Sequence, residues 1–130
     1  MIKIGIDVGS TTAKLVAVDE NDNLLFSKYE RHNAKAKETI LSFLKELLSE
    51  IGDKDISVRI TGSIGMGISE KCSLPFVQEV VAAAKAIQKD YSHVTSMIDI
   101  GGEDAKVVFF KDAEATDLRM NGNCAGGTGA

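Results

Sequence analysis

The stretch that decides the fold is IGIDVGSTTAKLVAV, residues 4–18. Its first part alternates β-branched residues with small or polar ones, which predicts a strand over Met1–Asp7. A glycine and hydroxyl residues interrupt the pattern, and a second strand is predicted over Ala13–Asp19. A tight turn between two strands points several backbone N–H groups into one concavity that suits an anion such as phosphate. The stretch therefore indicates a β-hairpin with a candidate phosphate site at its turn.

Asp7 and Lys14 add charge to this turn. Asp7 ends the first strand and can hold Mg²⁺, through water because Mg²⁺ dehydrates reluctantly. Lys14 supplies a positive charge for phosphate. The turn is not a Walker A loop, since no G-x4-GK[ST] run occurs, and an ordinary glycine hairpin is the alternative interpretation. The candidate phosphate-binding residues are Gly9, Ser10, Thr11, Thr12 and Lys14.

A second stretch, MIDIGGE at residues 97–103, repeats the pattern at the end of another predicted strand. Asp99 occupies the place of Asp7, and Gly101, Gly102 and Glu103 form the turn. For this stretch taken alone, an ordinary acidic hairpin without function is the alternative interpretation. Two such hairpins from facing units can hold one polyphosphate from both sides. The repeat predicts a first unit over residues 1–92 and the start of a second, truncated unit over 93–130.

The remaining pattern predicts an α/β fold in the order βββαβα followed by a second hairpin, with helices flanking a mixed sheet. Asn33 is the expected N-cap of the first helix, Gly52 ends it, and Pro75 is expected in the first turn of the second helix. The other predicted elements are a strand over Leu24–Arg31, a helix over Ala34–Ile51, a strand over Ile56–Ile60, a glycine-rich loop over Thr61–Gly67, a helix over 74–90, and strands over Val94–Ile100, Ala105–Lys111 and Thr116–Met120.

Composition excludes several classes of protein. The 130 residues include 15 Lys and Arg against 19 Asp and Glu, a net charge of −4, so a binder of the nucleic-acid backbone is not expected. No apolar run approaches the roughly 20 residues that span a bilayer, and no signal peptide is evident. Two cysteines are too few for a disulfide scaffold. We therefore expect a cytoplasmic protein without membrane or nucleic-acid partners.

Cys124 lies in a third glycine-rich stretch, NGNCAGGTGA at residues 121–130, which has the pattern of a loop that enters a helix. A cysteine at a helix start has a lowered thiol pKa and is a good metal ligand or nucleophile, but one cysteine cannot hold a metal alone. A small buried core residue is the other interpretation. Cys72 is interpreted as structural or incidental, and His32 and His93 as surface residues at element ends.

These motifs together resemble a known family. Ile4–Asp19 and Asp99–Lys106 resemble the first and second phosphate motifs of the superfamily of actin, sugar kinases and heat-shock-chaperone ATPases. The Cys-Ala-Gly-Gly-Thr-Gly-Ala run at 124–130 is similar to that of 2-hydroxyacyl-CoA dehydratase activases and benzoyl-CoA reductase ATPase subunits, the BadF/BadG/BcrA/BcrD type. The resemblance covers the whole chain and implies a ribonuclease-H-like fold, one half of an actin-like ATPase. Members of that family are longer, so we expect the chain to be an N-terminal fragment.

The resemblance also implies a function, an ATPase of anaerobic metabolism that drives electron transfer. ATP and Mg²⁺ bind between two halves, and a [4Fe-4S] cluster shared by a homodimer passes a low-potential electron to a dehydratase partner. Cys124 matches one cluster ligand; the second cysteine of each family subunit lies beyond residue 130. Ferredoxin or flavodoxin would be the electron donor. Asp7 would serve Mg²⁺, and Asp99 or Glu103 would lie near the attacking water. The fragment alone is expected to lack catalysis.

Two other functions remain open at this stage. A sugar or N-acetylglucosamine kinase of the same superfamily would share both phosphate hairpins, and Cys124 would then be a packing residue. A nucleotide-gated, actin-like scaffold would share them as well, but it leaves the cysteine loop without a role. The family pattern Thr-Gly-Tyr-Gly-Arg is kept here only as Thr61-Gly62, which puts any role of that loop in doubt.

Overall fold

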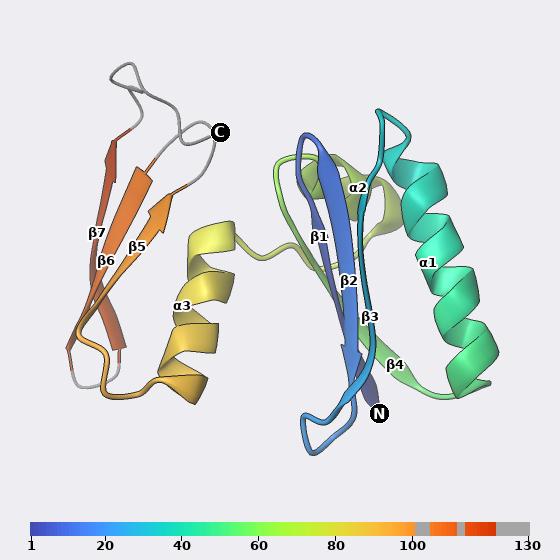
Figure 1. The fold of residues 1–130 in the computed structure, drawn as a ribbon, viewed down its shortest axis with the longest axis horizontal. Coiled ribbons are helices and arrows are strands. Elements are labelled where there is room, and N and C mark those ends of the chain that lie inside the picture. The colour runs from blue at the N-terminus through green and yellow to red at the C-terminus, as the bar shows by residue number, and fades with distance from the viewer. Residues whose placement is uncertain (101–104, 112–113, 122–130) are drawn as a thin grey trace. The chain divides into compact units, whose positions relative to one another are not determined.

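A computed structural model describes residues 1–100, 105–111 and 114–121. By contacts between residues the chain divides into two units, Met1–Gln78 and Glu79–Ala130, each described below by itself (Figure 1). The predicted boundary at residue 92 stays a prediction. The elements in chain order are β1 (Ile2–Val8), β2 (Thr12–Val18), β3 (Leu24–Arg31), α1 (Ala36–Ile51), β4 (Ile56–Thr61), α2 (Gly65–Cys72), α3 (Glu79–Asp90), β5 (Ser96–Ile100), β6 (Ala105–Lys111) and β7 (Glu114–Asn121).

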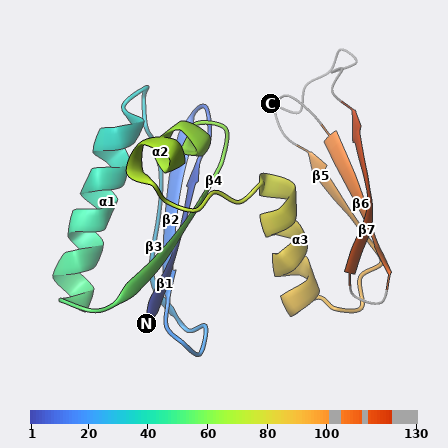
Figure 2. The ribbon, with the colours of Figure 1, turned by 180° about the vertical axis from the view of Figure 1, so that it is seen from behind.

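The first unit is built on a four-stranded sheet in the order β3-β2-β1-β4. The β1–β2 and β2–β3 pairs are antiparallel and the β1–β4 pair is parallel, so the predicted mixed sheet is confirmed. Alternate residues of each strand face α1, which lies against one side of the sheet in both ribbon views (Figures 1 and 2). The core between them contains Ile2, Ile4, Ile6, Val8, Ala13, Leu15, Ala17, Phe26, Ile40, Phe43, Leu47 and Ile60. The opposite face of the sheet carries Asp7 and Lys14 together with Val16 and Tyr29.

Helix α1 contacts the sheet through only part of its apolar residues. Ile40, Phe43 and Leu47 are buried, whereas Leu41 and Leu48 are exposed. Its end at Gly52 is confirmed: this residue has a φ of 72°, and its N–H donates to the Leu48 carbonyl oxygen at 3.0 Å. The expected Asn33 cap is wrong, because the helix begins at Ala36 and Lys35 occupies the N-cap position without a side-chain hydrogen bond.

The segment after β4 differs most from the prediction. The expected loop over 61–67 contains the start of α2, because Gly65 and Gly67 take helical conformations that glycine tolerates at a modest cost. The second predicted helix begins at Glu79, later than expected. Pro75 instead lies in an extended segment whose backbone pairs with Ile60, from which its carbonyl oxygen accepts a hydrogen bond at 3.0 Å. Pairing with a strand outcompetes the local preference of proline for a first helical turn.

The second unit has an antiparallel three-stranded sheet in the order β5-β6-β7, as expected for a returning hairpin. Helix α3 lies beside this sheet in both ribbon views (Figures 1 and 2). Ala84 of α3 and Val108 of β6 are buried, and Glu79 forms an ion pair with Lys106 at 3.7 Å. Within the described residues, no helix combines the length and apolar character that crossing a membrane requires.

Candidate functional site

A row of four side chains crosses the sheet of the first unit on the face opposite α1. Strand pairing aligns Tyr29 with Lys14, Lys14 with Asp7, and Asp7 with Thr61, one residue from each strand. The ammonium of Lys14 lies 3.1 Å from Asp7 Oδ2 and 5.4 Å from the centre of the Tyr29 ring. Both charged side chains remain about one-third to two-fifths exposed, 34% for Asp7 and 43% for Lys14. The pair is therefore preorganised yet open to a ligand.

The Gly9–Thr12 turn stands at the end of this row. The Gly9 N–H donates to the Thr12 carbonyl oxygen at 3.0 Å, which closes the turn. Within the described residues, the backbone N–H groups of Ser10 and Thr11 have no acceptor, and both residues are exposed. Unused amides beside a lysine are the donors that a phosphate oxygen accepts from.

His32 holds the turn from the side, and its burial corrects the expectation of a surface residue. It is 5% exposed. Its backbone N–H donates to the Thr11 carbonyl oxygen at 3.1 Å, and its ring contacts the Gly9 carbonyl oxygen through Nε2 at 2.8 Å. The Ala34 N–H donates to ring Nδ1 at 3.1 Å. Because a carbonyl only accepts and an amide only donates, these partners require a neutral ring with its proton on Nε2. Its position after the last strand residue gave no sequence signal for this role.

The residues that follow His32 adopt an unusual backbone. Asn33 and Ala34 have φ values of 49° and 61°, in the left-handed region that residues with a Cβ rarely occupy. This conformation turns the chain back so that the Ala34 amide meets the His32 ring. The local strain is therefore held by the same contacts that fix the turn.

Thr61 and Gly62 bring the end of β4 against Asp7. Gly62 has a φ of 99°, and a Cβ there would lie 2.2 Å from the Val8 carbonyl oxygen and 2.7 Å from Asp7 Oδ1. Only glycine permits this approach. Beside it, Thr61 Oγ1 is a buried oxygen with no hydrogen-bond partner within the described residues. A buried hydroxyl without a partner is rare and marks a place where water, an ion or a ligand completes the bonding.

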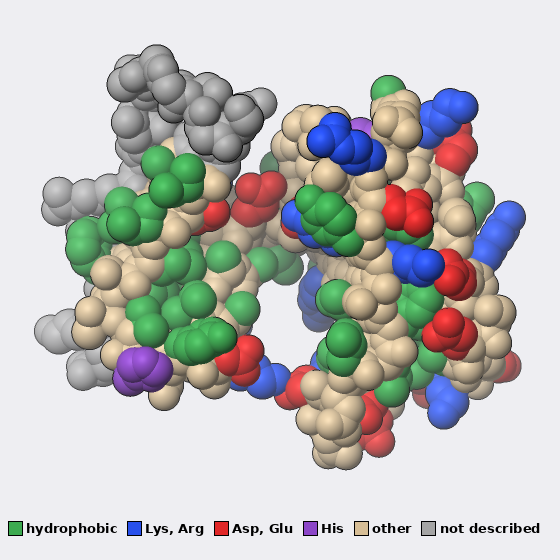
Figure 3. Space-filling model, in the orientation of Figure 1, with side chains coloured by type: hydrophobic (Ala, Val, Ile, Leu, Met, Phe, Trp, Pro, Cys, Tyr) green, Lys and Arg blue, Asp and Glu red, His purple; other side chains and the backbone are tan. Residues whose placement is uncertain are grey.

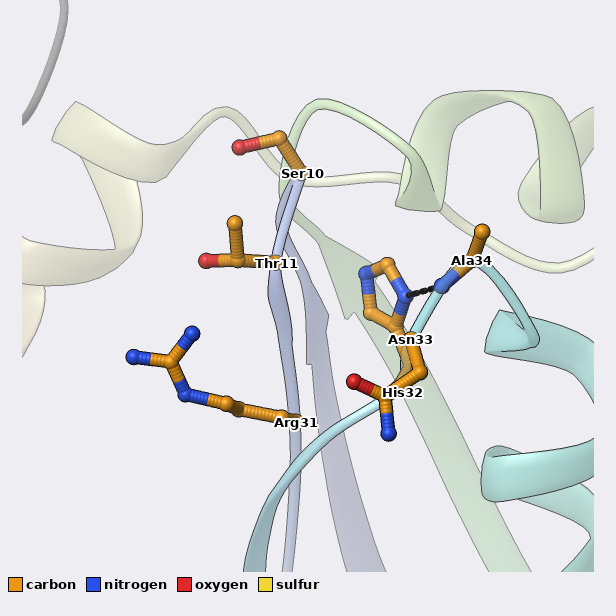
Figure 4. A pocket seen from close by; sticks show the side chains of 6 residues that line it. All are labelled: Ser10, Thr11, Arg31, His32, Asn33 and Ala34. Carbon is orange, nitrogen blue, oxygen red and sulfur yellow. Dashed lines mark hydrogen bonds between the residues drawn. The ribbon is translucent and has the colours of Figure 1, made fainter.

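A small pocket opens beside the turn, with a volume of about 140 Å³. Figure 4 shows the hydroxyl groups of Ser10 and Thr11 and the side chain of Arg31 extending to the same side, while the His32 ring lies toward Ala34. The pocket is lined by Ser10, Thr11, Arg31, His32, Asn33 and Ala34. Two of the predicted phosphate residues therefore line a cavity, and sequence reasoning missed Arg31 and His32.

Only part of the second predicted phosphate motif, residues 97–103, lies among the residues that the structure describes. Asp99 belongs to β5, is partly buried, and pairs across the strands with Lys106. Gly101, Gly102, Glu103 and Cys124 lie outside the described residues. Cys72 is exposed and has a free thiol. Within the described ranges, no three His, Cys, Asp or Glu residues gather as a metal site.

The sequence of this chain is similar to those of one ATPase family and of several known proteins. The sequence profile of the BadF/BadG/BcrA/BcrD ATPase family matches residues 4–130. The protein MJ0004 of Methanocaldococcus jannaschii is 32% identical over 128 residues, which are 97% of this chain and 51% of that protein. The (R)-2-hydroxyglutaryl-CoA dehydratase activating ATPase of Acidaminococcus fermentans is 26% identical over 128 residues, 97% of this chain and 49% of that protein.

A solved structure shares the fold of this chain. The activator of the 2-hydroxyisocaproyl-CoA dehydratase from Clostridium difficile, with bound ADPNP, superposes with a TM-score of 0.79 at 28% identity. The match covers 99% of this chain and 48% of that one. This chain thus spans about half the length of these relatives. The likeness confirms the predicted fold class, the mixed α/β half of an actin-like ATPase.

Proposed function

The chain belongs to the BadF/BadG/BcrA/BcrD ATPase family, and on that premise we propose that the protein is an ATP-dependent activase of a 2-hydroxyacyl-CoA dehydratase or a benzoyl-CoA reductase-like partner. The observation that carries the proposal is the Asp7–Lys14 pair beside the Gly9–Thr12 turn, whose Ser10 and Thr11 amides lack acceptors within the described residues. The activator that binds ADPNP in its solved structure supports ATP as the ligand.

In this proposal the first unit binds the phosphates of ATP. The amides and hydroxyls of Ser10, Thr11 and Thr12 donate hydrogen bonds to phosphate oxygens, and Gly9 allows the backbone to approach. Lys14 neutralises phosphate charge, and Asp7 keeps it oriented from 3.1 Å away. These donors need no rearrangement, because the turn is already closed by the bond from the Gly9 amide to Thr12.

The residues around Asp7 suit hydrated Mg²⁺. This ion prefers oxygen ligands and keeps several of its waters, so a site needs one carboxylate and further acceptors for those waters. Asp7 supplies the carboxylate, and the unpartnered Thr61 Oγ1 supplies a hydroxyl beside it. When bound, Mg²⁺ would neutralise charge on the phosphates.

The second phosphate motif is part of the same proposal. Gly101 and Gly102 contribute to phosphate binding, and Asp99 or Glu103 orients the attacking water. A carboxylate in this place accepts a hydrogen bond from the water and aligns it with the terminal phosphorus. Either assignment makes ATP hydrolysis depend on both hairpins.

Cys124 is proposed as a ligand of a [4Fe-4S] cluster shared by two subunits of a cytoplasmic homodimer. Such a cluster is held by cysteine thiolates and supplies one-electron chemistry at low potential when bound. The electron would come from ferredoxin or flavodoxin and pass to the dehydratase-type partner, with ATP hydrolysed to ADP and phosphate.

Iron content and visible absorption test this function most directly. The longest natural form of the protein is purified without oxygen beside its Cys124→Ser variant. We expect about four irons per dimer in the wild type, since one cubane cluster holds four, and loss of colour in the variant with ATP binding retained. Cys72→Ser is the matched control, because it removes an exposed thiol and should leave the iron in place.

A colourless wild type that still binds ATP would remove the electron-transfer proposal. ATP turnover that rises with added sugars would then favour the kinase, and ATP-dependent filaments would favour the scaffold. Retention of iron in Cys124→Ser would show that Cys124 is not a ligand.

A further inference from the structure

Arg31 lies on the functional face of the first sheet. It is the last residue of β3 and pairs with Thr12, the first residue of β2. Since side chains alternate along a strand, Arg31 shares its face with Tyr29 and, across the strand pair, with Lys14. Lys14 in turn pairs with Asp7. The guanidinium therefore belongs to the same side of the sheet as the Asp7–Lys14 pair.

Arg31 differs from the lysines of this sheet in having no side-chain partner among the residues that the structure describes. Within the described residues, no ion pair or side-chain hydrogen bond involves its guanidinium, although the side chain is exposed. By contrast, Lys3, Lys14 and Lys28 each contact a carboxylate within 3.1 Å. All five N–H donors of the planar guanidinium are therefore available to a ligand.

The surroundings of Arg31 are those of an anion site. The pocket of about 140 Å³ that it lines is also lined by Ser10, Thr11 and Asn33. Figure 4 shows these two hydroxyl groups extending to the side on which Arg31 extends. Cationic and neutral donors on one small pocket suit a tetrahedral oxyanion, and an arginine fork binds phosphate oxygens two at a time.

The backbone fixes the distance from Arg31 to the turn. His32, the next residue, makes three hydrogen bonds that join this end of β3 to Gly9, Thr11 and Ala34. Because the ring is buried and holds these bonds, the base of the Arg31 side chain cannot move away from the turn without breaking them. His32 is thus a positioning residue, and Arg31 is the group that reaches the ligand.

We propose that Arg31 binds a phosphate group of the nucleotide, as a cation on the β3 side of the Gly9–Thr12 turn that complements Lys14 within the sheet. This inference rests on the proposed nucleotide site and assigns that site an additional residue. Substitution of Arg31 should weaken binding of the phosphate chain about tenfold, the effect of losing one charge-assisted contact.

The test uses the longest natural form of the protein at physiological salt, where long-range charge effects are screened. The wild type, Arg31→Gln and Arg59→Gln are titrated with magnesium tripolyphosphate and with Mg·ATP by calorimetry. Amide resonances of Ser10 and Thr11 are followed in parallel by NMR. Arg59 is the matched control, because it lies on the same face of the sheet, in register with Gly5, and its guanidinium donates to its own strand.

We expect the amides of Ser10 and Thr11 to shift in all three proteins, with affinity reduced about tenfold in Arg31→Gln and within about twofold of wild type in Arg59→Gln. Equal affinities in the three proteins, with the amides shifting, would overturn the role of Arg31 and leave the proposed function intact. Amides that respond to neither ligand in the wild type would overturn the phosphate site itself, and the inference with it.

Discussion

Ile6-Asp7-Val8-Gly9 in the first unit and Ile98-Asp99-Ile100-Gly101 in the second share one pattern, and in each the aspartate pairs across the strands with a lysine. The apolar residues beside the two aspartates have opposite environments. Ile6 and Val8 are 4% and 0% exposed, whereas Ile98 and Ile100 are 66% and 72% exposed. The alternation that places aspartate on one face is thus local, but burial of the other face requires a covering element.

Helix α1 is that element in the first unit, through Ile40, Phe43 and Leu47. In the second unit, hydrophobic side chains gather on the visible surface in the space-filling view (Figure 3), and the exposed ones include Ile98 and Ile100 of β5 and Phe109 of β6. No described residue of that unit covers Ile98 and Ile100. The lysines differ too: Lys14 contacts its paired aspartate, whereas Lys106 contacts Glu79 of α3.

The largest expected effect comes from a substitution in α1, the helix that covers the sheet of the first unit. Phe43 is 1% exposed, so Phe43→Ala should lower the free energy of unfolding of this unit by about 4 kcal/mol. Ile98→Thr should change the second unit by less than about 0.5 kcal/mol, as an exposed position does. Urea unfolding followed by amide resonances of each unit measures both. Leu48→Ala, at an exposed site of the same helix, is the control, and a loss as large as that of Phe43→Ala would contradict the assignment of the covering face.

Substitution of Gly62 tests how closely the end of β4 approaches the first hairpin. Gly62→Ala places a Cβ 2.2 Å from the Val8 carbonyl oxygen at a φ of 99°, and should destabilise the first unit by about 3 kcal/mol. Gly67→Ala is the control, since a Cβ there meets nothing within 4 Å and improves helix propensity. The melting temperatures of both variants are compared by thermal unfolding. Equal melting temperatures would mean that β4 does not approach Asp7 as closely as described.

His32 joins the turn of the first hairpin to the end of β3 through its hydrogen bonds. His32→Phe keeps a ring of similar shape but leaves the Gly9 carbonyl and Ala34 amide without partners, so we expect a loss of about 2 kcal/mol. His93→Phe, at an exposed position of the second unit, should be nearly neutral. Chemical denaturation compares them, and hydrogen exchange at Ser10 and Thr11 reports whether the turn opens. Unchanged exchange and stability in His32→Phe would show that the turn holds itself.

Substitution of Asp19 gives the smallest expected effect on stability. This residue follows β2, at the end of the strand away from the Gly9–Thr12 turn. Hydrogen bonds from the Asn23 side chain and from the Asn23 and Asn21 backbone amides lower the pKa of its carboxyl. The stabilisation is therefore full above the ordinary carboxyl pKa of about 3.9 and is lost as the pH falls through the lower folded value. Asp19→Asn should flatten the pH dependence of unfolding in that acidic range, measured by denaturant midpoint.

Much of the first unit could be predicted from its sequence. The alternation over 4–18 predicted β1 and β2, and the actual strands end within one residue of the predicted ones. Helix α2 was missed, because Gly65 and Gly67 weaken the helical pattern that tertiary packing restores. The late start of α3 was missed because the 74–78 segment pairs with β4, a contact that periodicity within one segment does not reveal.

The sequence by itself determined that Asp7 and Lys14 share a face at a glycine turn, since alternation along two linked strands is a local property. Only the tertiary structure decided that Thr61 and Gly62 lie against Asp7, because that contact needs the parallel pairing of β4 with β1 across an intervening helix. It also decided that His32 is buried and that Arg31 lines the pocket, because both depend on where the end of β3 meets the turn. Residue type sets what a side chain can bind, and long-range pairing sets which side chains bind together.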